Sequence, residues 1–327
     1  MPSSGGTRAW LVIQSLARVR LLRRLARAAL VSFAVMTIAF GLLRLAPGDP
    51  VLILLGQEAT PETVAEFRRV LGLEGNIAEQ YSRYVSGLAQ GDLGRSLVTR
   101  TSVTSIVGRT LPVSAWLILT TVVLAVLLAV PLGTAAAIYR RTRFNDVFRI
   151  VTSILIATPI FFSGLIMLLI FAVRLKLAPV AGYDPSFPLN LYHLWLPAVI
   201  ICGVLVPTLA RVLQSSISET MEQEFVEAAV VRGLPARTRL WSYILRPSAA
   251  PAVGLLGYII GSLLSATVII ELIFDLPGIG RELIVAVLGR DYPVVQGVVL
   301  LFGIIVVFVS FLSELLSGWL DPRTQAA

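Results

Sequence analysis

The sequence predicts an all-α, polytopic membrane protein with about six transmembrane helices. Hydrophobic residues make up 56% of the 327 residues and charged residues only 14%, whereas soluble proteins have roughly 45–50% and about 25%. The mean hydropathy is +0.85, and single soluble cores stop growing near roughly 250–300 residues. Because one soluble core cannot bury this much apolar surface, the chain requires a lipid bilayer.

Six apolar stretches are long enough to cross the hydrocarbon core, which needs about 20 apolar residues for each helix. They are residues 26–45, 113–139, 150–173, 195–213, 252–274 and 297–320. Four prolines fall inside these stretches, where neighbouring helices and Ser or Thr hydroxyls can satisfy the freed carbonyls. They are Pro131, Pro159, Pro197 and Pro207.

Arginine orients the predicted helices. The N-terminal segment (residues 1–25) is basic and contains no acid, and the loops 140–149 and 214–247 are also rich in arginine, whereas the loop 174–194 has only one Arg and one Lys. The positive-inside rule therefore places both termini in the cytoplasm. We interpret the net charge of +8 as topological rather than as a nucleic-acid-binding patch. The N-terminal segment is expected to lie along the anionic inner leaflet, as a retained anchor rather than a cleaved signal peptide.

A long external segment, residues 46–112, separates the first two spans and is too patterned for a simple connector. Thr60 followed by Pro61 predicts the start of one amphipathic helix, which Gly72 would end. Asn76 with Glu79 forms the capping-box pattern of a second helix. We expect their apolar stripes to pack on the outer ends of the protein's own spans, and a docking or gating role on the external face is the functional alternative.

The cytoplasmic segment, residues 214–247, predicts two short helices joined at a glycine. Glu and Ala favour a helix before Gly233, this glycine suits a C-terminal cap, and Pro235 suits the first turn of another helix. Ala228 and Ala229 would leave room for a partner, and Glu227 and the nearby arginines could pair with it. A solvated charged face is the simpler interpretation.

Side chains that carry catalysis are scarce. The chain has one Lys, one Cys and one His, namely Lys176, Cys202 and His193. One residue of each type excludes an intrachain disulfide, a Cys/His metal cluster and a zinc-protease motif. Lys176 does not follow the glycine pattern of a P-loop, so this chain should not hydrolyse ATP by itself. We expect His193 to belong to an interfacial belt and Cys202 to be a packing residue.

The chain resembles the membrane subunits of binding-protein-dependent ABC importers, in the dipeptide/oligopeptide permease subfamily that also includes nickel and glutathione permeases. Glu227-Ala228-Ala229 followed by Gly233 matches the EAA loop of that family. The resemblance covers residues 30–323, and its other motifs are RLAPGDP at 44–50, LGL at 71–73, GDLG at 91–94, DLPGIG at 275–280, RDYPVVQG at 290–297 and LDPR at 320–323. Leu245-Arg246 stands where the family usually has Leu-Pro, which leaves the end of the second cytoplasmic helix open.

The resemblance implies a type I ABC importer transmembrane fold over residues 26–323, followed by a short tail at 324–327. The chain would be half of the path for di- or oligopeptides in the inner membrane of a prokaryote, with nickel or glutathione as alternative substrates. Its expected partners are a homologous second permease, two ATPase subunits or domains that hold ATP and Mg²⁺, and an extracytoplasmic substrate-binding protein. The residues implied in coupling to the ATPase are Glu227, Ala228, Ala229, Gly233, Leu234 and Arg237.

An ion-coupled secondary transporter is the alternative from another mechanistic class. Such carriers place ionisable groups near the midplane. Here Glu271 and Glu314 lie towards the outer and inner ends of the last two spans, and we interpret both as interfacial or helix-packing residues. An intramembrane enzyme has less support, because the sequence contains no Gly-x-Ser-x-Gly elbow.

Overall fold

The computed structural model describes residues 29–41, 50–56, 59–70 and 73–320, and the secondary structure of this part is helical apart from one isolated bridge between Arg95 and Ser102. An apolar helix, Ala29–Gly41, comes first. The following elements are α2 (Pro50–Leu55), α3 (Pro61–Val70), α4 (Ile77–Ala89), α5 (Val103–Ile138), α6 (Arg143–Ala157), α7 (Ile160–Met167), the π-helix η2 (Leu168–Arg174), α8 (Leu189–Met221), α9 (Glu224–Val231), α10 (Ala236–Thr238), the π-helix η3 (Arg239–Leu245), α11 (Arg246–Ile273), α12 (Ile279–Leu288) and α13 (Tyr292–Leu320).

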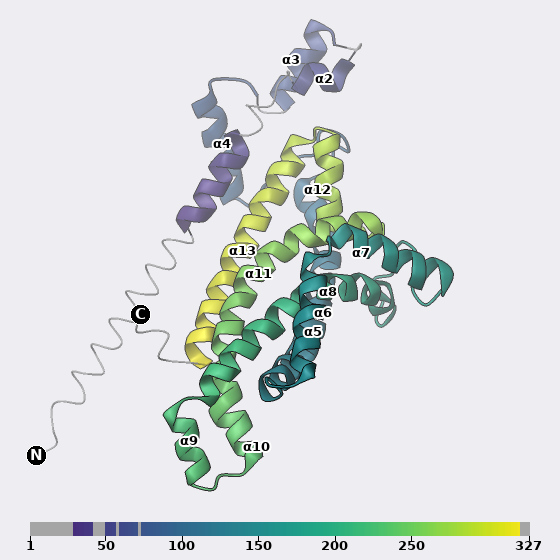
Figure 1. Cartoon of the computed structure of the whole chain (residues 1–327). Helices are drawn as coiled ribbons and strands as arrows, with labels where there is room; N and C mark the ends of the chain where they lie inside the picture. Colours follow the sequence, from purple (N-terminus) through teal and green to yellow (C-terminus); the bar gives the residue numbers. More distant parts are fainter. Residues whose placement is uncertain (1–28, 42–49, 57–58, 71–72, 321–327) are drawn as a thin grey trace, which may run out of the picture.

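Three described helices are long and apolar enough to cross a membrane by themselves: α5, α8 and the Tyr292–Ser313 part of α13. The bent pair formed by α6 with α7 and η2 can supply a fourth span, and the shorter apolar helices Ala29–Gly41 and Gly261–Ile273 lie in the two other predicted stretches. The all-α membrane prediction is confirmed, although the described part does not contain six unbroken spans. The long helices lie against one another between the external elements α2–α4 and α12 and the cytoplasmic end at α9 (Figure 1).

The contact between α5 and α8 is the centre of the bundle. Buried residues of α5 recur every four positions on the face towards α8: Leu117, Thr121, Ala125, Ala129 and Gly133. Small residues at this spacing allow two helix backbones to approach closely in a membrane. A β-carbon on Gly133 would lie 2.7 Å from the carbonyl oxygen of Ala210, so the closest approach depends on that glycine. Pro131, Pro197 and Pro207 lie inside continuous helices, as predicted.

The predicted third span is not one helix. The chain bends by 96° between Arg143–Ala157 and Ile160–Arg174. Thr158 adopts an extended conformation with ψ 123°, because the ring of Pro159 disfavours the helical conformation of the preceding residue. The expectation that Pro159 sits inside a continuous span is therefore wrong, and α7 with η2 projects sideways from the bundle (Figure 1).

The two external helices have the predicted starting points. The Thr63 N–H donates to Thr60 Oγ1 at 3.3 Å before α3. At α4 the capping box is complete, since the Glu79 N–H donates to Asn76 Oδ1 at 2.8 Å and the Asn76 N–H donates to Glu79 Oε2 at 3.3 Å. Gly72 lies outside the described residues, as do the N-terminal segment 1–25 and the tail 324–327.

The apolar stripe of α4 packs on the protein's own first helix. The ring of Phe40 meets that of Tyr81 edge on and packs at a tilt against that of Tyr84, with ring centroids 5.0 and 5.5 Å apart. The hydroxyls of Tyr81 and Thr37 are 2.8 Å apart. The packing expectation is therefore confirmed for α4. The last part of the external segment is already helical, because α5 begins at Val103 and continues unbroken into the span predicted from 113.

A second small core holds the external ends of α5, α12 and α13 together, with Val103, Ile279 and Val298 among its buried residues. Asp291, which is 4% exposed, connects the loop before α5 to this core through hydrogen bonds. Its carboxylate accepts hydrogen bonds from Ser96 Oγ and from the N–H groups of residues 97 and 98. The GDLG and RDYPVVQG motifs also pack together although they are far apart in the chain, since a β-carbon on Gly94 would lie 3.6 Å from Pro293 Cβ and one on Gly297 would lie 3.6 Å from Leu93 Cβ.

Candidate functional site

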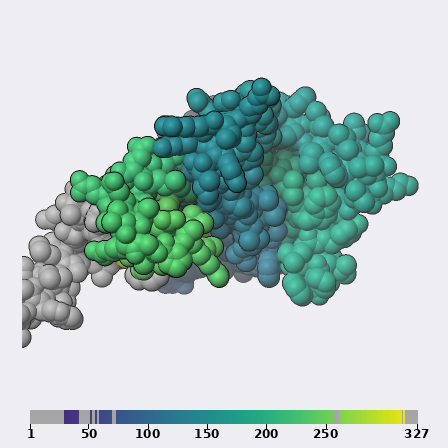
Figure 2. Space-filling view, turned by 60° about the horizontal axis from the view of Figure 1, so that its bottom comes forward, coloured from purple at the N-terminus to yellow at the C-terminus, as the bar shows by residue number. Residues whose placement is uncertain are grey.

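The cytoplasmic segment (residues 214–247) forms a hairpin below the bundle (Figure 1). α8 ends at Met221, α9 runs from Glu224 to Val231, and after a tight turn the chain returns through α10 and η3. Viewed with the cytoplasmic end turned forward, this segment is the green lobe beside the end of α5 and the start of α6 (Figure 2).

The turn after α9 is closed by a glycine cap. Gly233 has φ +68°, which an L-residue with a β-carbon rarely adopts. Its N–H donates to Val230 O at 2.9 Å, and the N–H of Leu234 donates to Ala229 O at 3.2 Å. This pair of bonds is a Schellman motif, which satisfies the last carbonyls of a helix. The predicted C-terminal cap is confirmed.

The second predicted short helix does not exist as a separate element. Pro235 precedes the helix as its N-cap residue, and α10, η3 and α11 follow without a gap from Ala236 to Ile273. Pro247 has no N–H and its ring clashes with the carbonyl four residues earlier in an α-helix. The π-helix η3 ends at Leu245, and Pro247 lies in the first turn of α11, a position that tolerates proline. The second cytoplasmic helix therefore does not end at Leu245-Arg246, because it continues into the span.

Burial divides the implied coupling residues into two groups. Ala229 is 2% exposed and lies with Val226 on the face of α9 towards the protein. The expectation that Ala229 leaves room for a partner is therefore wrong. Glu227 and Ala228 are on the exposed face. Gly233 and Arg237 are also exposed, whereas Leu234 is half-buried.

Two apolar side chains of the hairpin are also exposed and were not predicted from the sequence. Val231 of α9 is 83% exposed and Trp241 of η3 is 59% exposed. A tryptophan in an otherwise charged cytoplasmic segment was the signal that could have drawn attention to the second residue. Large apolar side chains beside charged ones are typical of protein contact sites.

Polar contacts at its base fix the lobe to the bundle. Arg140, in the turn after α5, forms an ion pair with Glu222 at 2.7 Å. Ser248 of α11 donates to Thr220 Oγ1 of α8 at 2.8 Å and to the carbonyl oxygen of Ser216 at 3.3 Å. A surface held at its base in this way can transmit a push from a bound partner to the helices.

The buried Glu271 has a structural role at the opposite end of α11. Its side chain is 0% exposed. Ser114 Oγ donates to Glu271 Oε1 at 2.5 Å and the N–H of Arg281 donates to Oε2 at 2.9 Å, while Ser114 Oγ accepts from the N–H of Ile279 at 2.9 Å. The carboxylate thus caps the first turn of α12, where negative charge is favourable. This supports the interpretation of Glu271 as a packing residue. The side chain of Glu314 lies outside the described residues.

The single histidine and cysteine have ordinary structural contacts. His193 Nδ1 lies 3.0 Å from the carbonyl oxygen of Gly182, and its ring meets those of Tyr183 and Tyr192 edge on. Cys202 is buried in the main core. In the described ranges no three His, Cys, Asp or Glu residues are grouped so that they could hold a metal ion.

Comparison with known proteins gives a consistent result along the whole chain. The family described as binding-protein-dependent transport system inner membrane component matches residues 129–326, and its N-terminal counterpart matches residues 18–118. A putative peptide transport system permease protein of Brucella abortus is 33% identical, over 93% of this chain and 98% of its own length. A di/tripeptide transport system permease protein of Pseudomonas aeruginosa is 33% identical over 90% and 94%. A nickel import system permease protein of Staphylococcus aureus is 32% identical over 93% and 91%.

Proposed function

The chain belongs to the family of binding-protein-dependent transport system inner membrane components, and from this membership we propose that it forms one half of the translocation path of an ATP-driven peptide importer. It is a multi-pass inner membrane protein, an ABC importer permease with the type I importer membrane fold. Permeases of this kind are transport components rather than catalysts. The peptide substrate, the subunit composition and the coupling residues are the parts that we propose.

The cytoplasmic lobe is proposed as the contact with the ATPase subunits. The observation that carries this proposal is the exposure of Glu227 and Ala228 on α9 and of Trp241 on η3, the two arms of the hairpin. Gly233 and Leu234 form the capped turn that follows α9, and the exposed Arg237 lies in α10 just after it. ATP and Mg²⁺ would be bound by the partner subunits, so movement of those subunits would act on this chain through the lobe.

The rest of the complex is proposed from the same membership. A homologous second permease would complete the path, two ATPase subunits or domains would supply energy, and an extracytoplasmic binding protein would deliver substrate. The large apolar residues left exposed on α7 and η2 support an apolar partner in the membrane, since Phe161, Leu165 and Leu169 are each more than half exposed. Lipid covers whatever area the second permease does not.

Peptide is the proposed substrate class because relatives named for peptide transport match this chain over nearly its full length. Nickel is the second candidate, carried by a relative of almost equal identity, and glutathione is the third. Uptake of a labelled dipeptide, a labelled oligopeptide, labelled glutathione and radioactive nickel by the reconstituted complex distinguishes them. Saturable import of nickel without import of peptides would refute the peptide proposal.

Reconstitution also tests the energy source. We expect no accumulation of substrate by this chain alone in liposomes with an ion gradient, and accumulation with ATP once both permeases, the ATPase subunits and the binding protein are present. Transport driven by an ion gradient through this chain alone would overturn the proposal.

A docking role for the external segment is a second proposal. α3 keeps its polar face exposed, including Glu62 and Glu66, while α4 is packed on the first helix. We expect charge reversal at Glu62 and Glu66 to weaken delivery from the binding protein and to leave ATPase assembly unchanged. Unchanged uptake with unchanged affinity for the binding protein would refute a docking role for α3.

A further inference from the structure

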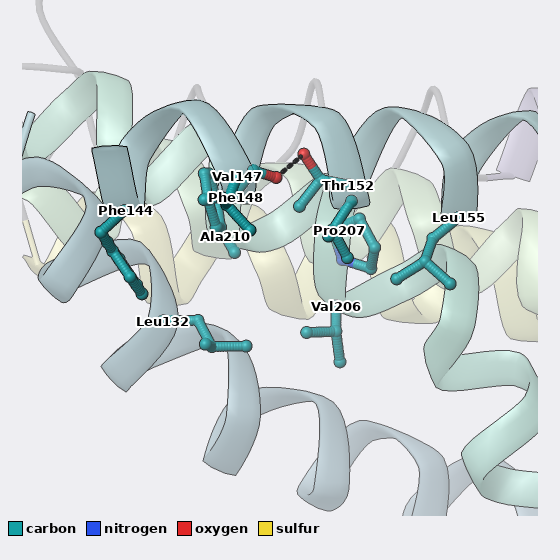
Figure 3. A pocket seen from close by; sticks show the side chains of 10 residues that line it. Leu132, Phe144, Val147, Phe148, Thr152, Leu155, Val206, Pro207 and Ala210 are labelled. Atoms are coloured by element: carbon teal, nitrogen blue, oxygen red, sulfur yellow. Dashed lines mark hydrogen bonds between the residues drawn. The ribbon is translucent and has the colours of Figure 1, made fainter. Parts of the chain in front are cut away.

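An apolar groove runs along the surface of the bundle where α5, α6 and α8 meet (Figure 3). Phe144, Val147, Val151 and Leu155 of α6 form its long wall, and Val206 and Pro207 of α8 lie across from them. Its volume is about 210 Å³, larger than the ~150 Å³ apolar cavity that holds benzene in an engineered protein. The groove is therefore large enough to hold part of an apolar molecule.

Among the described residues that line this groove, the one polar side chain is that of Thr152. Its hydroxyl is already paired, since it donates to the carbonyl oxygen of Phe148 at 2.7 Å and accepts from Arg211 Nε at 2.8 Å. A polar occupant would lose its hydrogen bonds to water without replacement, which costs free energy. The groove should therefore bind a hydrocarbon chain in preference to a polar group.

The length of the groove matches one leaflet of the bilayer. Its α6 wall extends from Phe144 to Leu155 (Figure 3), and eleven residue steps at about 1.5 Å each give a length of about 16 Å. Half of a hydrocarbon core of roughly 30 Å is about 15 Å. A single acyl chain lying along the groove would reach from the membrane surface to about the midplane.

The cytoplasmic end of the groove is basic. α6 begins at Arg143, which shares a helix face with Val147 and Val151 by four-residue spacing. Arg141 lies in the turn just before, and both arginines are exposed and form no ion pair within the described residues. The acidic residue nearest to these two arginines in the sequence is Asp146. This end faces the inner leaflet, which is rich in anionic lipids. The two unpaired guanidinium groups are therefore expected to attract negatively charged lipid headgroups.

We propose that the groove holds one acyl chain of an anionic phospholipid of the inner leaflet, with the phosphate group bound by Arg141 and Arg143. The acyl chain covers the apolar wall, and the two arginines select the headgroup. The lipid then fills the gap that α6 leaves against α5 and α8 on the cytoplasmic side of the bend at Thr158.

The test counts lipids that stay bound to the full-length chain. The protein is equilibrated in vesicles of phosphatidylglycerol and phosphatidylcholine, extracted in mild detergent, and weighed by native mass spectrometry. We expect the wild type to retain phosphatidylglycerol, and Val151→Trp to lose it because the indole fills the groove. The matched control is Ile154→Trp, since Ile154 is 60% exposed on α6 and does not line the groove. This control should retain the lipid.

The headgroup is tested without altering the groove. Each of Arg141→Gln and Arg143→Gln should lower the preference for phosphatidylglycerol over phosphatidylcholine on the order of fivefold. Arg174→Gln, at the far end of η2, should not change it. Equal retention in Val151→Trp and Ile154→Trp would overturn the proposal. So would a photocrosslinker at Val147 that labels the second permease instead of lipid in the assembled importer.

Discussion

The carboxyl group of Glu271 occupies the space that a side chain at Gly278 would need. A β-carbon on Gly278 would lie 2.2 Å from Cδ of Glu271, far inside van der Waals contact. Glu271 belongs to α11, and Gly278 is the N-cap residue of α12. Glycine at this position is therefore what allows the buried carboxylate to reach the first turn of α12.

Gly278→Ala should therefore break the contact between the Glu271 carboxylate and the first turn of α12. The added methyl group displaces the carboxylate, and each buried donor that it leaves unsatisfied costs about 1–3 kcal/mol. We expect a lower Tm of the purified protein and faster hydrogen exchange in residues 279–288. Gly108→Ala is the matched control, because a β-carbon there meets nothing within 4 Å. Equal Tm values for the two variants would contradict the capping role of Glu271.

Glu227→Lys should weaken binding of the ATPase subunits without affecting the fold. Its side chain is exposed on α9, so the free energy of unfolding should change by no more than about 0.5 kcal/mol. We expect at least a fivefold loss of affinity, equivalent to about 1 kcal/mol, measured by co-purification and by stimulated ATPase activity. Asp146→Lys reverses a charge elsewhere on the cytoplasmic side and should leave ATPase binding intact. Normal coupled uptake by Glu227→Lys would count against the coupling assignment.

Substitutions at Gly233 should rank by their tolerance of positive φ. A β-carbon at this position meets no atom within 4 Å, so the cost comes from the backbone alone. Gly233→Val should destabilise the turn by roughly 1–2 kcal/mol and uncouple ATP hydrolysis from uptake. Gly233→Asn should be milder, because Asn adopts the left-handed conformation more readily. Equal uptake by the two variants would show that the left-handed turn is not needed for coupling.

The docking of α4 should depend on pH above 10. Burial raises the pKa of Tyr84 to about 12 from its ordinary value of 10, so the docked helix favours the neutral phenol. Its stabilisation is complete below pH 10 and is lost as the pH rises towards 12. Spectrophotometric titration should show that Tyr84→Phe removes a tyrosine that titrates near pH 12. A difference curve between the wild type and Tyr84→Phe with its midpoint near pH 10 would refute this assignment.

Features that depend on neighbouring residues were predictable from the sequence. The capping box of Asn76 and Glu79 and the glycine cap at Gly233 each involve residues that are only a few positions apart in the chain. Local chemistry is sufficient to specify them, and the helices on either side follow the expected apolar periodicity.

Features that depend on distant contacts were not predictable. Glu271 is paired with Ser114, and nothing in the local sequence identifies that partner. Pro159 breaks its helix while Pro207 does not, although the ring of each disfavours the helical conformation of the residue before it. Ala229 rather than Ala228 is buried, since the rotation of α9 is set by its contact with the bundle.

The continuous helix from Ala236 to Ile273 joins the two sides of the membrane mechanically. At about 1.5 Å per residue it is roughly 57 Å long, with the cytoplasmic lobe at one end and the Glu271 clasp on α12 at the other. If the lobe binds the ATPase subunits as proposed, we expect a displacement there to reach α12 through this one helix, so that opening on one side and closing on the other would occur together.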